Sequence, residues 1–264
     1  MQFKFWLLAL SFISQPMAAQ VAFLARENGA TIQQIGDCSS RHTPWCSFNI
    51  ALSLMAYESG VLLDAQRPVL PYELGYQAGR AVCQQAQTPT SWIKNSCVWY
   101  SRALTQQLGL ATIRNYLAQF AYGNQDFSGD VGQNNSLTHA WLGSSLHISA
   151  NEQVTLVEKI LQRAFTLAPA TYAYTQQILF AEHLTATAQL YGKTGSGPFG
   201  NPNIAQAALT DGAALQHGWF VGWVIAGERQ IAFACYVADT EPQVLPAGLR
   251  AKQFAKEQLL KLLV

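Results

Sequence analysis

The sequence predicts an α/β (α+β) fold in which one mixed antiparallel sheet, assembled from the N-terminal and C-terminal strands, packs against a helical block. Three observations carry this prediction. Apolar runs flank Asn28-Gly29 near the N-terminus, helical periodicity fills the middle of the chain, and glycine-separated apolar runs occupy the last third. Strands at both ends with helices between them favour a single sheet covered by the inserted helices.

The first elements are a hairpin and a buried helix. In residues 21–36 the dipeptide Asn28-Gly29 has the φ preferences of a tight hairpin turn, so two strands are expected around it. Residues 47–59 carry apolar side chains on all sides, which is typical of a helix buried all round. This helix follows Thr43-Pro44 and ends at Gly60, and a loop-rich passage covers 63–90.

The later elements follow from periodicity. Helices are expected over 101–120, 136–146, 151–165 and 172–183. Three strands then follow, with a hairpin at Gly227-Glu228, and a final helix closes the chain; the strand sequences are "AQLYGKTGSG", "HGWFVGWVIAG" and "RQIAFACYVAD". No repeat or linker interrupts residues 20–264, which we interpret as one domain.

The N-terminus has the pattern of a secretory signal peptide over residues 1–19. Lys4 precedes an apolar stretch, and the small residues Ala18 and Ala19 stand where cleavage is expected. Polar residues and Pro16 interrupt the stretch, so it is too short for a membrane anchor, and no other stretch indicates a membrane span. We therefore expect a periplasmic or secreted protein.

Export fits the cysteine content. An oxidising compartment permits disulfides, and sequence proximity favours Cys38 with Cys46 and Cys83 with Cys97, leaving Cys235 unpaired. A net charge of +1 gives no reason to expect nucleic acid as a partner. The five histidines are scattered, with no His-x-x-x-His or Cys-x-x-Cys pair and no phosphate-binding glycine loop, so no metal or nucleotide cofactor is expected.

Three short motifs suggest a ligand site. In "YGKTGSG", a strand carrying Lys193, Thr194 and Gly195 offers an ammonium group, a hydroxyl donor and a backbone that a ligand can approach closely. Taken alone this triplet is equally compatible with a surface turn. It gains weight from "SCV" at 96–98 and "YGN" at 122–124, which precede it in the chain.

These motifs, in this order after a buried helix, resemble those of the class D β-lactamases, the oxacillinase branch of the penicillin-recognising serine enzymes. The segments "IALSLMAYESGVL", "LTHAWLGSSLHIS" and "GWFVGWVIA" are also similar to that family. The resemblance implies the penicillin-recognising serine β-lactamase/transpeptidase-like fold. It also implies a β-lactam or a peptidoglycan-like peptide as ligand.

In the family an S-x-x-K motif opens the buried helix. Its serine forms an acyl-enzyme, and its lysine, carboxylated by carbon dioxide, is the general base; residues three apart share a helix face, so the base reaches the nucleophile. The resemblance implies further roles for residues of this chain. Ser96 would be a proton-shuttling hydroxyl, Lys193, Thr194 and Gly195 would hold the ligand, Val98, Tyr122, Gly123 and Asn124 would shape the pocket, and Trp141 would steady the carboxylated lysine. For Val98, Tyr122 and Trp141, core packing is a compatible role.

The chain departs from the family in the stretch "PWCSFN". A gapless alignment puts Cys46 at the nucleophile and Asn49 at the lysine. An amide neither ionises near neutral pH nor takes up carbon dioxide, so Asn49 supplies no base, whereas Cys46 retains a potential nucleophile. A second alignment makes Ser47 the nucleophile. It brings no base, because Ile50 is then three residues on and Asn49 lies off the shared face.

The preferred hypothesis is therefore a binding protein that retains the β-lactamase frame and has lost most hydrolysis, since removal of a nucleophile or base costs on the order of 10⁴ to 10⁶ in rate. Two alternatives remain at this point. One is an active class D β-lactamase that works through Cys46 or Ser47. The other is a secreted scaffold with a relic pocket.

Overall fold

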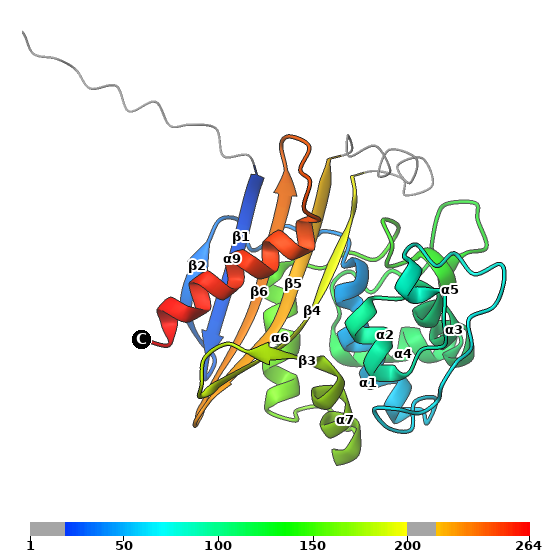
Figure 1. The fold of residues 1–264 in the computed structure, drawn as a ribbon, viewed down its shortest axis with the longest axis horizontal. Coiled ribbons are helices and arrows are strands. Elements are labelled where there is room, and N and C mark those ends of the chain that lie inside the picture. The colour runs from blue at the N-terminus through cyan, green and yellow to red at the C-terminus, as the bar shows by residue number, and fades with distance from the viewer. Residues whose placement is uncertain (1–18, 200–214) are drawn as a thin grey trace, which may run out of the picture.

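The protein has one six-stranded antiparallel sheet flanked by helices on both faces (Figure 1), in a computed structural model that describes residues 19–199 and 215–264. The sheet order is β2-β1-β6-β5-β4-β3, so strands from the two ends of the chain meet at the β1–β6 pair. The strands are β1 (Ala19–Glu27), β2 (Ala30–Ile35), β3 (Phe180–His183), β4 (Ala188–Pro198), β5 (Gln216–Ala226) and β6 (Arg229–Asp239). The expected sheet of N-terminal and C-terminal strands is confirmed.

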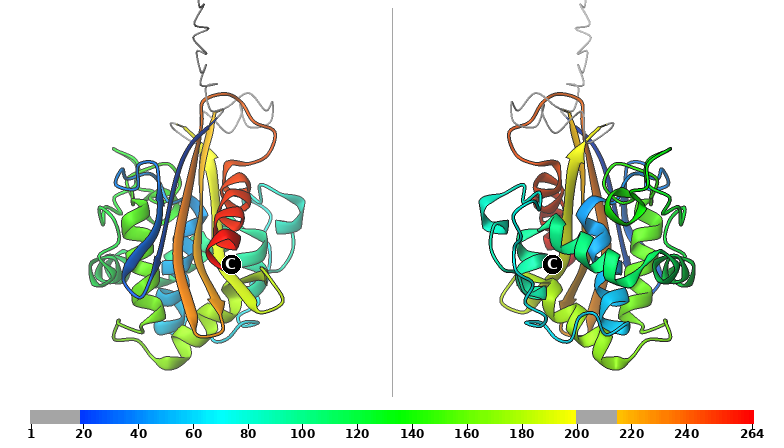
Figure 2. Two further views of the ribbon diagram at one scale, coloured as in Figure 1. Left: turned by 90° about the vertical axis from the view of Figure 1, so that its left-hand side faces the viewer. Right: turned by 90° about the vertical axis from the view of Figure 1, so that its right-hand side faces the viewer.

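The helices divide between the two faces of the sheet (Figure 2). Helix α9 packs on one face against β4, β5 and β6, and α6 packs on the other against β1, β5 and β6; the helices α1–α5 form a block beside the β4 side of the sheet (Figure 1). Each face has its own apolar core because side chains alternate along the strands. The α-helices are α1 (Asn49–Glu58), α2 (Pro89–Asn95), α3 (Val98–Leu108), α4 (Leu110–Phe120), α5 (Ser136–His139), α6 (Ala150–Leu161), α7 (Pro169–Leu179) and α9 (Ala247–Leu262), and 3-10 turns span Trp45–Phe48 and Ala81–Cys83.

Two sequence predictions hold in detail. The hairpin turns at Asn28 and Gly29, which both have positive φ (51° and 79°), as a type I′ turn requires. Helix α1 is buried over residues 49–57, as its all-round apolar sequence predicts. It continues directly from the 3-10 turn Trp45–Phe48. We call this continuous helical segment the α1 rod, and its N-terminal end at Pro44 the helix mouth.

Four helix predictions were wrong in extent. The helix expected over 151–165 is α6, which ends at Leu161. The segment 101–120 is two helices, α3 and α4, because Gly109 adopts φ 75° and ψ 156°, a conformation that breaks the helix. Only Ser136–His139 is helical within 136–146. Helix α7 ends at Leu179, and residues 180–183 form β3, because pairing with the edge of β4 overrides the local helical pattern.

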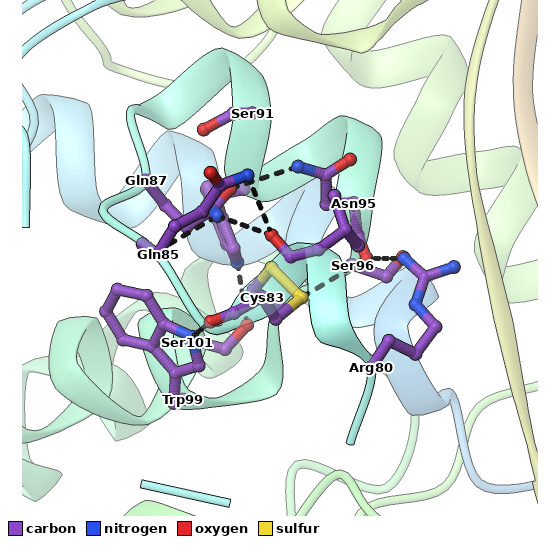
Figure 3. The surroundings of a disulfide bond; sticks show 12 residues. Arg80, Cys83, Gln85, Gln87, Ser91, Asn95, Ser96, Trp99 and Ser101 are labelled. Carbon is purple, nitrogen blue, oxygen red and sulfur yellow. Dashed lines mark hydrogen bonds between the residues drawn. A yellow bond between two sulfur atoms is a disulfide. The ribbon is translucent and has the colours of Figure 1, made fainter. Parts of the chain in front are cut away.

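One of the two predicted disulfides is confirmed. Cys83 and Cys97 are bonded, and the Trp99 indole nitrogen donates to the Cys83 carbonyl at 2.8 Å, which ties the loop before α2 to the start of α3 (Figure 3). The Cys38–Cys46 prediction was wrong: both thiols are free, as is Cys235. The Cys38 thiol lies against the carbonyl of Phe23, in the core beside the sheet.

No helix in residues 19–199 or 215–264 is long and apolar enough to cross a membrane. The predicted signal peptide lies outside the described residues, apart from its last position.

The close approach of β4 and β5 generates a stability prediction. A Cβ on Gly222 would lie 1.9 Å from the Tyr191 carbonyl oxygen, a backbone atom that cannot turn aside. We expect Gly222→Ala to cost about 1–3 kcal/mol, as overpacking does, and to lower the melting temperature by roughly 3–10 °C. Gln230→Ala, which removes an exposed side chain from β6, should leave the melting temperature unchanged. Equal melting temperatures for both variants would contradict the packing.

Candidate active site

The mouth of the α1 rod lies directly against β4. A Cβ on Gly195 would lie 2.8 Å from the Pro44 carbonyl oxygen and 2.9 Å from the Cys46 nitrogen. Glycine is therefore required for β4 to approach the helix mouth this closely. The contact brings the Lys193-Thr194-Gly195 segment beside Cys46, as the order of the motifs predicts.

Trp45 holds the turn before Cys46 in an unusual conformation. Its φ is 49°, which is rare for a bulky residue and costs of order 1–3 kcal/mol. Two contacts offset the cost. The Trp45 indole ring packs over Gly197, where a Cβ atom would overlap the ring. The indole nitrogen donates to Nε2 of His217 at 3.1 Å. Tyr236 holds the other ring nitrogen of His217 at 3.1 Å. Sequence reasoning missed this anchor, because nothing in the spacing of Trp45 and His217 indicates that they meet.

Cys46 lies beside Ser96 and Lys193. Burial raises the pKa of its thiol, while the Lys193 charge and the contact with the Ser96 hydroxyl lower it by less. The residue is 9% exposed, so its sulfur is next to, but mostly screened from, solvent. The resting thiol is therefore protonated at neutral pH, and a nucleophilic reaction at Cys46 needs a base.

Ser96 and Lys193 form a hydrogen-bonded pair. Ser96 caps α2 in the left-handed conformation (φ 52°), which turns its side chain toward Lys193, and the Lys193 ammonium donates to the Ser96 Oγ and, at 2.9 Å, to the Thr194 carbonyl. Burial lowers the pKa of Lys193 to about 8, partly offset by the nearby Cys46. An appreciable fraction of this amine is thus neutral slightly above physiological pH.

The disulfide positions this pair. Cys97 directly follows Ser96, and Arg80 donates to the carbonyl of Asn95, so the Cys83–Cys97 bond and the Arg80 contact flank the Ser96 turn (Figure 3). The Arg80 charge also lowers the pKa of Lys193 and of Cys46. Sequence reasoning did not select Arg80. The one feature of the sequence that could have pointed to it is its position three residues before Cys83, which forms the disulfide.

Ser47 points away from Cys46 and Lys193. It is fully buried; its hydroxyl donates to the Pro44 carbonyl at 2.7 Å and accepts from the Gln153 amide at 3.0 Å. Both bonds hold the side chain in the core on the α6 side. The geometry thus favours the gapless alignment, in which Cys46 occupies the position of the nucleophile.

Asn49 faces a buried polar cluster of neutral groups. Its Oδ1 accepts from the Ser101 hydroxyl at 3.1 Å, and that hydroxyl accepts from the Trp92 indole at 2.9 Å. Within the described part of the chain, the Asn49 amide nitrogen and the Trp141 indole nitrogen are buried without a hydrogen-bond partner. The Asn49 amide nitrogen and the Trp141 indole nitrogen are thus both donors without an acceptor among residues 19–199 and 215–264.

The remaining predicted residues lie in the core or in a loop. Tyr122 is buried with its ring edge-on to Phe48 at 5.6 Å, and Trp141 packs on the same Phe48, so both have the core role that was considered for them. Val98 is half-buried against the core. Asn124 is exposed and braces its loop through bonds to the Ser145 carbonyl and the His147 backbone nitrogen.

A pocket of about 390 Å³ opens at Lys193 and Thr194. It lies between α2, the α7–β3 junction and β4, and it collects positive charge; its lining includes Thr90, Ile93, Lys94, Gln177, Phe180, Gly192 and Lys252. This charge suits a ligand that carries a carboxylate.

Comparison with known proteins places the chain in a family. The model of the penicillin binding protein transpeptidase domain matches residues 23–261. The chain is 37% identical over 219 residues to β-lactamase OXA-1 of Escherichia coli, covering 83% of this chain and 74% of that protein. The crystal structure of the OXA-427 class D β-lactamase superposes with a TM-score of 0.80 at 36% identity, covering 92% of this chain and 99% of that one. The chain belongs to the class D β-lactamase family.

Penicillin receptors share the fold of this class D family member. The C-terminal domain of the Bacillus licheniformis BlaR penicillin-receptor superposes with a TM-score of 0.77 at 25% identity, covering 92% of this chain and 90% of that domain. The regulatory protein BlaR1 of Bacillus licheniformis is 27% identical over 82% of this chain, which spans 32% of that longer protein.

The carbon dioxide modification of this family does not fit the present site. It requires an amine at the position of Asn49, and the residue there is a carboxamide whose oxygen is already bonded to Ser101. The indole nitrogen of Trp141, the donor that the family resemblance assigns to the carboxylated lysine, is buried without a hydrogen-bond partner in the part of the chain that the structure describes.

The position of Ser47 gives a testable consequence. Ser47→Ala removes the acceptor of the buried Gln153 amide, so we expect a loss of about 1–3 kcal/mol in the free energy of unfolding. The rate at which iodoacetamide alkylates Cys46 should stay within about twofold of wild type, because the thiol does not contact this hydroxyl. Denaturant titration and peptide mapping measure the two effects. A Ser47→Ala variant with full stability and altered Cys46 reactivity would contradict this orientation.

Proposed function

We propose that this class D family member is exported and binds β-lactams or peptidoglycan-like peptides in the Cys46–Lys193 cleft without sustained hydrolysis. The observation that carries the proposal is the replacement of the family's base by Asn49, an amide held by Ser101 within a buried neutral cluster. Water that must attack an acyl intermediate has no group there to take its proton.

The ligand-binding half of the site supports recognition. Lys193 and Thr194 line the basic pocket, and Ser96 is hydrogen-bonded to Lys193; an ammonium group and hydroxyls are the groups that hold a carboxylate. Relatives of this chain include both β-lactamases and a penicillin receptor, so the fold supports turnover and capture alike. For this chain we attribute capture without turnover to the missing base at Asn49.

Restoring the two missing groups tests the proposal. The double variant Cys46→Ser with Asn49→Lys, assayed with a chromogenic cephalosporin and added bicarbonate, should gain at least about 100-fold in steady-state hydrolysis, since loss of such groups typically costs on the order of 10⁴ to 10⁶. The matched control is Cys46→Ser with Asn49→Gln, which should remain inactive because a second amide supplies no base.

Two results would contradict the proposal. Sustained hydrolysis by the wild-type chain would mean that the site has another base and that the chain is an active β-lactamase. A folded double variant without any gain would mean that Asn49 is not the position that matters. Reversible binding is measured separately, by displacement of a fluorescent penicillin from the Cys46→Ala variant.

A further inference from the structure

We propose that Cys46 is a single-use acyl acceptor whose thiol opens a β-lactam ring, with Ser96 and Lys193 forming the path that removes and returns the proton. This inference rests on the proposed function, because it requires a β-lactam to bind in the cleft. It assigns to Lys193, through Ser96, the proton transfer that Asn49 cannot perform.

Two observations support the path. The Ser96 hydroxyl accepts from the Lys193 ammonium, and it lies close enough to the Cys46 thiol to lower the pKa of that thiol. Lys193 is 3% exposed, and its second hydrogen bond goes to the carbonyl of Thr194, so its nitrogen is fixed toward Ser96. The close approach at Gly195 keeps this strand at the helix mouth.

The step balances without another reactant. A neutral Lys193 accepts a proton from Ser96 as Ser96 takes the proton of the thiol. The sulfur of Cys46 then forms a bond to the lactam carbonyl carbon, and the carbon–nitrogen bond of the ring breaks. The departing nitrogen recovers the proton from Lys193 through Ser96. The product is a thioester that retains every atom of the β-lactam.

Burial is the main cause of the lowered Lys193 pKa; the Arg80 and Lys252 charges add to it, and Cys46 opposes it. The charged or titratable groups that influence Lys193 are the Cys46 thiol, Arg80 from the loop before the disulfide, and Lys252 from α9. Lys252 also pairs with Glu182 at 2.7 Å. Lys94 lines the same pocket as Lys193. With a pKa of about 8, roughly 1% of Lys193 is neutral at pH 6 and about 90% at pH 9.

The thioester should persist once formed. Its hydrolysis needs an activated water, and the neighbouring side chain on the helix face is the Asn49 amide, bonded to Ser101. We expect Lys193 and Ser96, on the β4 side of the sulfur, to stay hydrogen-bonded to the departed nitrogen of the opened ring, which keeps this base from an incoming water. The chain then reports one encounter with a β-lactam and stays modified.

Intact-mass spectrometry after mixing with benzylpenicillin tests the inference. We expect a mass increase equal to one whole penicillin, mapped to Cys46, with an initial rate that rises about 50- to 100-fold between pH 6 and pH 9. In Lys193→Arg, which keeps the charge and cannot act as a base in this range, the rise should disappear while displacement of a fluorescent penicillin persists. Lys256→Gln, a lysine change on α9 outside the pocket, should behave as wild type.

The outcomes separate the two proposals. Reversible displacement without an adduct at any pH, or an adduct mapped to Cys38 or Cys235, overturns the acyl-acceptor inference and leaves the proposed binding function intact. An unchanged pH profile in both Lys193→Arg and Ser96→Ala overturns the proton path. No displacement by wild type, Cys46→Ala or Lys193→Arg overturns the binding function itself. Far-ultraviolet circular dichroism of each variant confirms that it is folded.

Discussion

The backbone of β4 at Gly195 packs against the backbone of the helix mouth at Pro44 and Cys46, with no room between them for a Cβ atom. This contact sets the position of β4, and with it Lys193, relative to Cys46. Lys193 there donates to Ser96, which is held from the other side by the turn next to the disulfide. The strained Trp45 turn and the Cys83–Cys97 bond hold the two sides of the same junction. The frame of a class D β-lactamase is therefore maintained around an altered reacting pair.

Electrostatics explain how the altered pair differs from its relatives. Burial keeps the thiol of Cys46 protonated and also lowers the pKa of Lys193 to about 8, so the neutral amine is populated at mildly alkaline pH while the thiol still carries its proton. On the other side of the nucleophile, Asn49, Ser101 and Trp92 form a neutral hydrogen-bonded set. The site can thus move a proton on the β4 side and has no base on the α3 side, which favours capture over turnover.

Much of this arrangement follows from the sequence. The Asn28-Gly29 turn, the apolar patterning and the buried α1 helix predict the sheet and its helical cover, whereas the residues of the cleft were expected from the resemblance that the three motifs carry. Contacts that depend on tertiary structure were not predictable in this way. The bond between Trp45 and His217 joins residues 172 positions apart, β3 forms only because β4 offers an edge, and Cys38 faces the core beside Phe23 rather than Cys46. The choice between Cys46 and Ser47 likewise depended on Gln153, which lies on a distant helix.

The central claim is that the wild-type protein captures β-lactams and does not turn them over. It is tested most directly by counting the equivalents of a chromogenic cephalosporin opened per protein molecule at saturating ligand and pH 8, followed until the signal is constant. The account predicts a total of at most about one equivalent, with no linear phase after it. A steady linear phase that consumes many equivalents per molecule would contradict it.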